Sequence, residues 1–113
     1  MKLRDVVSDL VIDPRKLTDY ALDPTAPWGR HKAAAFAQKL GFTRENYTDL
    51  LSQIKAQALD AEAILRGQDE FGQRYAVDLI IRGVQGQQAI VRTGWLVRPG
   101  SDQAHLVTLY VRR

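Results

Sequence analysis

The chain contains no cysteine and only two histidines among its 113 residues. The absence of cysteine excludes disulfide bonds, thiolate metal ligands and cysteine nucleophiles, and it is compatible with a reducing compartment. The two histidines, His31 and His105, are 74 positions apart, and no third ligand has the spacing of a metal site. We therefore expect neither a metal ion nor another cofactor.

Long apolar runs are also missing. No run approaches the roughly 18 apolar residues that a membrane-spanning helix needs. The first five residues are not followed by the apolar stretch of a signal peptide. A length of 113 residues suits a single domain with one modest core. We expect no membrane span in this domain.

Lysine is absent after Lys55, so every cation in the last part of the chain is an arginine. Residues 1–70 carry ten Lys or Arg against eleven Asp or Glu, a net charge of −1. Residues 71–113 carry six Arg against two Asp, a net charge of +4. The guanidinium group binds phosphate through two hydrogen bonds and stacks on bases. Arginines also occur as solvated side chains on exposed strands, and charge alone leaves both interpretations open.

Three helices are predicted in the first half of the chain, over residues 16–22, 30–40 and 43–59. Asp13 and Pro14 have the N-cap and first-turn preferences that begin the first helix. Gly41 suits the C-terminal cap of the second helix, and Thr43 suits the N-cap of the third.

Alternating apolar residues and turn signals predict an antiparallel meander in the second half, over residues 61–65, 73–81, 89–97 and 105–111. The expected fold is therefore α+β, with N-terminal helices packed on a four-stranded antiparallel sheet. Residues 1–12 are expected to be a leading segment, which ends in either a short strand or a linker stub. Residues 13–113 are expected to form the single domain.

Side chains on a strand alternate between its two faces. In the last strand this alternation places Val107, Leu109 and Val111 on one apolar face and leaves Thr108 and Tyr110 on the other. The two hydroxyl groups could orient a phosphate, and the tyrosine ring could stack on a base. The alternative is a solvated strand face, because Thr and Tyr both favour β-structure.

The two preceding strands supply further polar candidates. Arg74 and Asp78 share one face, and Arg92 alternates with Thr93. Arg92 could stabilise the additional charge of a pentacoordinate phosphate, or it could simply pair with Asp78 across the strands. Trp95 lies on the same face as Thr93, where core packing is the expected role.

His31 lies between Arg30 and Lys32 at the start of the second predicted helix. Histidine titrates near neutral pH, which suits general acid or base catalysis. The alternative is a surface histidine at a helix start. Lys32 beside it is a candidate for contacts with a nucleic-acid backbone.

Several short strings, taken in order, resemble a domain family found at the C-termini of filamentous-haemagglutinin-like and other polymorphic toxins. They are IDPRKLTDYAL at residues 12–22, GRHKA at 29–33, YAVD at 75–78, VRTGW at 91–95 and LVTLY at 106–110. That family is in turn similar to the ribonuclease superfamily of barnase, EndoU, colicins and RelE. In this superfamily, helices precede a four-stranded sheet whose face is catalytic.

The resemblance implies a metal-independent endoribonuclease toxin that cleaves RNA, with tRNA as the favoured substrate. It also implies delivery as the C-terminus of a larger secreted or surface-displayed exoprotein, and action in the cytoplasm of a competing bacterium. The partners it implies are the RNA, a cognate immunity protein that is acidic where it docks, and in some systems a host activator.

The resemblance also completes the predicted site. A Thr-x-Tyr pair on the final strand belongs to the active site of related toxins, and Thr108 and Tyr110 match it; His31, Trp95 and Asp78 match other members' residues. The predicted catalytic residues are His31, Arg92, Thr108 and Tyr110, and the predicted substrate-binding residues are Lys32, Arg74, Asp78, Thr93 and Trp95. Two alternatives stay open: a non-enzymatic protein-binding module of a toxin–antitoxin or immunity system, and a DNA-targeting toxin.

Overall fold

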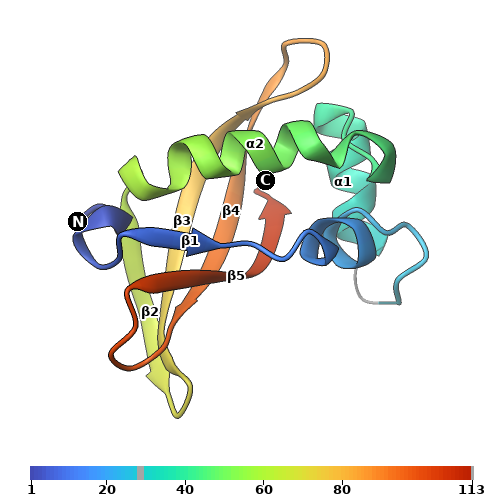
Figure 1. Ribbon diagram of the computed structural model, residues 1–113. Helices are drawn as coiled ribbons and strands as arrows, with labels where there is room; N and C mark the ends of the chain where they lie inside the picture. Colours follow the sequence, from blue (N-terminus) through green and yellow to red (C-terminus); the bar gives the residue numbers. More distant parts are fainter. Residues whose placement is uncertain (28–29, 113) are drawn as a thin grey trace.

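The computed structural model describes residues 1–27 and 30–112, and Figure 1 shows their arrangement. One sheet of five strands carries the helices. In chain order the strands and helices are β1 (Asp9–Val11), the π-helical turn η2 (Leu17–Ala21), α1 (Arg30–Leu40), α2 (Tyr47–Gln57), β2 (Ala63–Asp69), β3 (Gly72–Arg82), β4 (Gln88–Val97) and β5 (Gln103–Val111). Short 3₁₀ turns lie at η1 (Leu3–Asp5), η3 (Arg44–Asn46) and η4 (Ala58–Asp60).

The predicted four-stranded antiparallel sheet with N-terminal helices is wrong. The sheet is mixed, with the strand order β1-β5-β4-β3-β2, and β1 runs parallel to β5. A strand therefore precedes the helices along the chain. The prediction failed because β1 has only three residues and pairs with residues 103–105, a partner that is remote in sequence and that no local pattern identifies.

The meander from β2 to β5 follows the predicted order, with antiparallel pairs between consecutive strands. Its register places Asp78 opposite Arg92, and Arg92 opposite Tyr110. Since directly paired residues lie on the same face of a sheet, these three side chains form one row across β3, β4 and β5.

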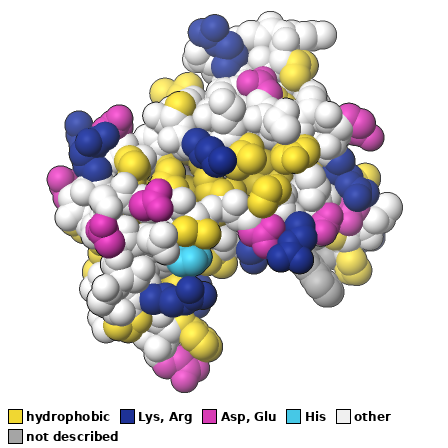
Figure 2. Space-filling view, viewed as in Figure 1, with side chains coloured by type: hydrophobic (Ala, Val, Ile, Leu, Met, Phe, Trp, Pro, Cys, Tyr) yellow, Lys and Arg dark blue, Asp and Glu magenta, His cyan; other side chains and the backbone are white. Residues whose placement is uncertain are grey.

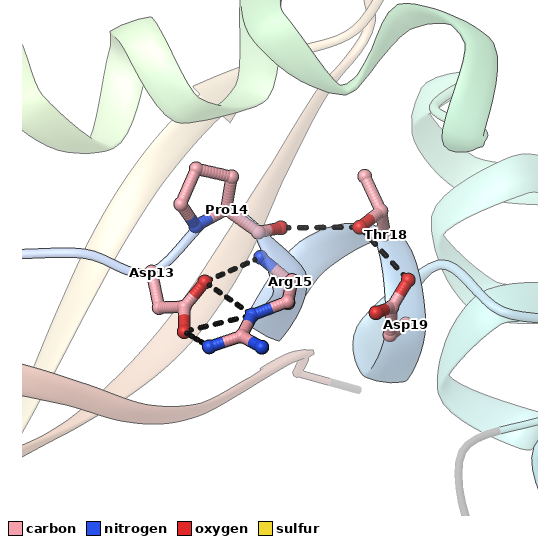
Figure 3. A network of polar contacts seen from close by, with 5 residues as sticks. All are labelled: Asp13, Pro14, Arg15, Thr18 and Asp19. Carbon is pink, nitrogen blue, oxygen red and sulfur yellow. Dashed lines mark hydrogen bonds and ion pairs between the residues drawn. The ribbon is translucent and has the colours of Figure 1, made fainter.

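A polar network around Asp13 precedes η2, whose N-cap residue is Lys16 and has no side-chain capping hydrogen bond. The Asp13 carboxylate accepts hydrogen bonds from the Arg15 backbone N–H at 3.0 Å and from the Arg15 guanidinium at 2.7 Å. Figure 3 shows this network, in which Thr18 donates to both Pro14 O and Asp19. The guanidinium hydrogen bond is the main reason why the pKa of Asp13 falls to about 2. The polar network closes the turn that leads from β1 into η2.

The helix α1 ends as predicted, whereas α2 is shorter than the helix predicted over residues 43–59. Gly41 ends α1 with a φ of 74°, a left-handed conformation that glycine adopts without strain. Thr43 caps the turn that precedes α2, because its hydroxyl accepts a hydrogen bond from the Glu45 backbone at 3.3 Å. These caps explain why the two helices fold as separate elements.

The core lies between the helices and one face of the sheet. In Figure 1, α2 crosses in front of β3 and β4. Alternate residues of the strands point toward the helices and are buried, as the alternation of a half-buried strand requires. The buried set includes Phe36, Leu40, Leu50, Ile54, Val77, Leu79, Ile81, Val91, Trp95 and Leu109.

Residues 1–12, which were expected to be a leading segment, contribute to the fold. Leu3 and Val7 are 0% and 2% exposed, and both belong to the hydrophobic core. The Leu3 N–H donates to Ala61 O at 3.0 Å, and β1 pairs with β5. In the described part of the chain, no helix is both long enough and apolar enough to cross a membrane.

Candidate functional site

The face of the sheet that points away from the core is called the open face here. It consists of alternate residues of β3, β4 and β5, and its central row is Asp78, Arg92 and Tyr110. The next row along the strands contains Ala76, Gly94 and Thr108. The alternation of polar residues in the sequence thus placed Arg92, Asp78, Thr108 and Tyr110 together, and the structure has them on this one face.

Asp78 organises two arginines on the open face. The Arg92 guanidinium donates two hydrogen bonds to its carboxylate, from Nε at 2.8 Å and from a terminal nitrogen at 3.1 Å. Arg112 donates a third at 2.8 Å. Chiefly because of the Arg92 hydrogen bond, the pKa of Asp78 lies below its ordinary value, and that of Arg92 is raised. Asp78 is therefore ionised near neutral pH and holds Arg92 in a fixed orientation.

Lys32 joins α1 to the open face. Its ammonium group donates to the Tyr20 hydroxyl at 2.7 Å and to Thr108 Oγ1 at 3.0 Å. It also lies 4.6 Å from the centre of the Tyr20 ring and 5.6 Å from the centre of the Tyr110 ring, within the range of cation–π attraction. We call these four residues the lysine cluster. The hydrogen bond from Lys32 is the largest reason why the pKa of Tyr20 is lowered.

A β-bulge positions Thr108 in this cluster. Gly94 pairs with Thr108, but the next residue, Trp95, pairs with Leu106, so Val107 is an additional residue in β5. The bulge changes which residues face the core: Leu106 is 3% exposed, whereas Val107 is only partly buried. The expectation that Val107 shares the apolar face with Leu109 and Val111 is therefore corrected, because strict alternation does not hold across a bulge.

A hollow of about 210 Å³ lies in the open face beside the lysine cluster. Its floor contains two small residues, Ala76 and Gly94, which pair across the strands. Three guanidinium groups, a hydroxyl group and a phenol border it, from Arg66, Arg74, Arg92, Thr108 and Tyr110. An apolar floor with a basic border can accept a flat group that carries negative charge.

Of the predicted substrate-binding residues, Arg74 is accessible at the hollow, whereas Thr93 and Trp95 are buried. Arg74 borders the hollow and forms an ion pair with Asp69 at 2.7 Å. Thr93 and Trp95 are 0% and 1% exposed and belong to the core face. Trp95 donates to the Thr93 hydroxyl at 2.7 Å, and that hydroxyl donates to Val77 O at 2.7 Å. Their side chains satisfy one another within the core, so a ligand on the open face meets almost none of their surface.

His31 is placed apart from the other predicted catalytic residues. It is exposed and borders a separate groove with Leu22, Pro24 and Ala34. Consecutive helical residues are about 100° apart around the axis, so Lys32 faces the sheet whereas His31 does not. Within residues 1–27 and 30–112, the His31 side chain forms no hydrogen bond and no ion pair.

Sequence reasoning missed two residues of this region. Tyr20 was not among the predicted site residues; it packs partly buried against the core, and its hydroxyl also accepts a hydrogen bond from Lys32. Arg66 was left out because the first strand of the meander was predicted to end at residue 65, whereas β2 continues to Asp69. The pairing of β2 with β3 shifts between Leu65 and Gly67, and no local signal in the sequence identifies that shift.

The opposite side of the molecule has a different character. Figure 2 shows acidic and basic side chains interspersed around an apolar area on the face that bears α2. Among the described residues, no three His, Asp or Glu side chains converge as metal ligands would. At the hollow, Asp69 and Asp78 pair with Arg74 and Arg92.

Fold and site together define a small domain in which a five-stranded mixed sheet carries two α-helices on one face and a basic hollow on the other. The family described as "Domain of unknown function (DUF6883)" matches residues 2–113, and the chain belongs to that family. No curated protein and no solved structure matches the chain significantly.

Proposed function

We propose that this domain is an endoribonuclease and that the open face binds its RNA substrate. The observation that carries the proposal is the lysine cluster, in which Lys32 bridges Tyr20 and Thr108 beside Tyr110 and the Arg92–Asp78 pair. Cations and hydroxyl groups at hydrogen-bond spacing are what phosphoryl transfer from a ribose hydroxyl requires. The resemblance to toxin domains motivates RNA as the substrate.

In the proposed reaction, the 2′-oxygen of a ribose attacks the adjacent phosphorus while a general base accepts the 2′-proton. The bond from phosphorus to the 5′-oxygen breaks, and a general acid protonates that oxygen. The products are a 2′,3′-cyclic phosphate and a 5′-hydroxyl. DNA lacks the attacking hydroxyl, so the reaction is specific for RNA.

The lysine cluster supplies the proton-transfer groups in this proposal. Tyr20 is the base in this proposal, because its hydroxyl accepts the Lys32 hydrogen bond that lowers its pKa, and Tyr110 is assigned as the acid. Lys32 and Arg92 stabilise the charge that develops on the phosphate oxygens, and Thr108 orients Lys32. This assignment moves the proton transfer from His31, the predicted base or acid, to groups that contact the sheet.

The biological setting is part of the same proposal. The domain acts as a toxin in bacterial competition, is delivered by a larger exoprotein and cuts RNA, preferably tRNA, in the target cytoplasm, alone or with a host activator. Its cognate immunity protein covers the open face. Because that face is basic, we expect the covering surface to be acidic.

The decisive test is incubation of the purified domain with total RNA, with and without EDTA, followed by end mapping of the products. We expect cleavage in both conditions and 2′,3′-cyclic phosphate ends. Lys32→Met should lower the rate at least a hundredfold, the usual cost of losing one charge-stabilising group. Lys39→Met, an exposed lysine on the same helix, is the matched control.

His31→Ala separates the two assignments of the base. Loss of cleavage in His31→Ala with full activity in Lys32→Met would overturn the role of the lysine cluster. Intact RNA with every preparation would overturn the enzyme itself. Cleavage of DNA that needs a divalent metal ion would point to the DNA-targeting alternative.

A protein-binding module is the second candidate, because apolar side chains lie exposed on the same face. Ile80 and Ile90 pair across β3 and β4 and are 62% and 44% exposed. Exposed apolar patches on an otherwise polar surface mark contact with partners. Expression of the domain in bacteria distinguishes the candidates, because only the nuclease should arrest growth.

A further inference from the structure

We propose that the hollow beside the lysine cluster binds one unstacked base of a single-stranded RNA, and that Arg66 stacks on that base. This inference rests on the proposed function, which identifies the nucleic acid as RNA. It adds that the bound RNA is single-stranded and that Arg66 recognises one of its bases. It is carried by the size of the hollow, its apolar floor and the state of its three arginines.

The size of the hollow limits what can enter. Its volume of about 210 Å³ is below the roughly 300–1,000 Å³ of pockets that hold drug-sized ligands. One ring system fits this space, whereas stacked bases do not. A base that is paired in an RNA duplex cannot be presented singly, so the ligand must be a loop, a bulge or a single strand.

The floor is apolar, and the methyl group of Thr108 packs closely against it at Gly94. Gly94 has no side chain, and a Cβ atom at this position would lie 2.8 Å from Thr108 Cγ2. Glycine inside a strand often marks a place where a ligand or another backbone approaches closely. Ala76, which pairs with Gly94, adds only a methyl group. A bare phosphate would gain little from this floor, because a phosphate needs hydrogen-bond donors, whereas the face of a base gains from apolar contact.

The three arginines around the hollow are in different states. Arg92 and Arg74 are held by Asp78 and Asp69. For Arg66, no ion pair is found among residues 1–27 and 30–112, and its side chain is exposed on β2. A guanidinium in this state can lie flat on a base, because its π-surface and its charge are both available.

A second irregularity of the sheet positions Arg66. The pairing of β2 with β3 shifts between Leu65 and Gly67, so Arg66 is the additional residue at this point. Such bulges re-aim a side chain and are frequent beside functional sites. The two bulges, at Arg66 in β2 and at Val107 in β5, thus border the same hollow from opposite sides.

The experiment compares ligands with and without a base. AMP, GMP, CMP, UMP and ribose 5-phosphate are titrated into the ¹⁵N-labelled domain and followed by NMR, which measures millimolar affinities. We expect at least one nucleotide to bind about tenfold more tightly than ribose 5-phosphate, the size expected for one stacked base. The amide signals that shift should include residue 94.

Substitutions then locate the base. Arg66→Ala should weaken nucleotide binding about tenfold, and Arg66→Lys should not restore it, because a lysine keeps the charge but loses the planar stacking group. Ala76→Val fills the floor and should weaken nucleotide binding without changing the affinity for ribose 5-phosphate. Arg44→Gln, at an exposed arginine outside the hollow, is the control.

The outcomes separate this inference from the nuclease. Equal affinity for nucleotides and ribose 5-phosphate, or unchanged nucleotide binding in Arg66→Ala, overturns the base site even if the domain cleaves RNA. Base-dependent binding that Arg66→Ala abolishes supports the site even if no RNA is cleaved. Because Arg66 is exposed, its variant should fold normally, so the result does not depend on the floor variant.

Discussion

At the scale of single residues, the open face depends on one carboxylate. Asp78 accepts hydrogen bonds from Arg92 and Arg112. It therefore fixes the orientation of the Arg92 guanidinium and neutralises part of the positive charge of both arginines. Its side chain is 31% exposed, and that of Arg92 is 20% exposed. Partial burial makes this pair stronger than an ordinary surface ion pair, because water screens it less.

The pairing makes the contribution of Asp78 to stability depend on pH. The pKa of Asp78 in the folded protein lies below its ordinary value, so the stabilisation is fully present above the unfolded pKa of about 3.9 and is lost as the pH falls through the folded pKa. Asp78→Asn should therefore lower the free energy of unfolding by about 1–2 kcal/mol at pH 7. The difference should shrink below about pH 4.

Urea unfolding of both proteins at pH 7 and pH 3 measures this effect. Glu70→Gln, in the exposed β2–β3 turn, should change stability little at either pH. A difference between wild type and Asp78→Asn that is the same size at pH 3 and pH 7 would contradict the ion-pair explanation.

The sequence predicted the direction of some site side chains correctly and of others wrongly. Period-two alternation correctly placed Thr108 with Tyr110 on one face of β5, and the register of the strands adds Asp78 and Arg92 to that face. The sequence predicted His31 as catalytic and Lys32 as substrate-binding, but only Lys32 contacts the open face, because the directions of the two side chains depend on how α1 rotates against the sheet. Arg66 was missed for a related reason, because its position follows from a bulge that leaves no local signal.

At the scale of elements, the turns and bulges determine how the strands meet. Gly72 begins β3 with a φ of 139°, and a Cβ there would lie 2.2 Å from Val97 O and 2.9 Å from Arg98 Cα. The contact is with backbone, which cannot move aside as a flexible side chain would. The β2–β3 turn therefore packs directly against the end of β4, and only glycine fits at this point.

Gly72→Ala should therefore lower the free energy of unfolding by about 2–4 kcal/mol, through backbone strain and overpacking together. Gly67→Ala, in the adjacent strand, should have little effect, because nothing lies within 4 Å of the added Cβ. Chemical denaturation of the two variants beside wild type tests the pair. Equal losses would show that the effect comes from glycine content in the hairpin rather than from the contact with Val97.

The elements that the sequence predicted correctly have local causes, whereas the pairing of β1 with β5, which it missed, does not. Caps at Thr43 and Gly41 and alternation in β3 to β5 are readable within a few residues. The partner of β1 is not, because a three-residue strand pairs in parallel with a strand about 90 positions away. The wrong sheet composition follows from that single long-range contact.

At the scale of the whole molecule, the N-terminal segment closes the core. Leu3 is fully buried and lies on η1, which packs beside η4. The hydrophobic core is thus continuous from the first residues to β5. A division of the chain at residue 12 would remove both an edge strand and part of that core.

Leu3→Ala should consequently lower the free energy of unfolding by about 2–4 kcal/mol, as expected for a buried leucine truncated to alanine. Leu65→Ala removes the same atoms from a residue that is 50% exposed and should change stability by less than about 0.5 kcal/mol. Thermal and urea unfolding of both variants provide the measurement. A small loss in Leu3→Ala would mean that residues 1–12 are dispensable for the fold.

The distribution of charge over the whole molecule also predicts how binding responds to salt. The domain places Lys32, Arg74 and Arg92 on one side, so RNA binding should release counterions from several phosphates. For single strands, each neutralised phosphate contributes a slope of about −0.7 to log K against log salt concentration. Lys32→Met should reduce the magnitude of that slope by about 0.7, and Lys39→Met should leave it unchanged.

Fluorescence anisotropy with a 2′-O-methyl RNA oligonucleotide, which resists cleavage at its blocked 2′-position, measures both slopes. An unchanged slope in Lys32→Met would place the RNA backbone elsewhere on the protein, because a cation that contacts a phosphate cannot be removed without changing the number of ions released.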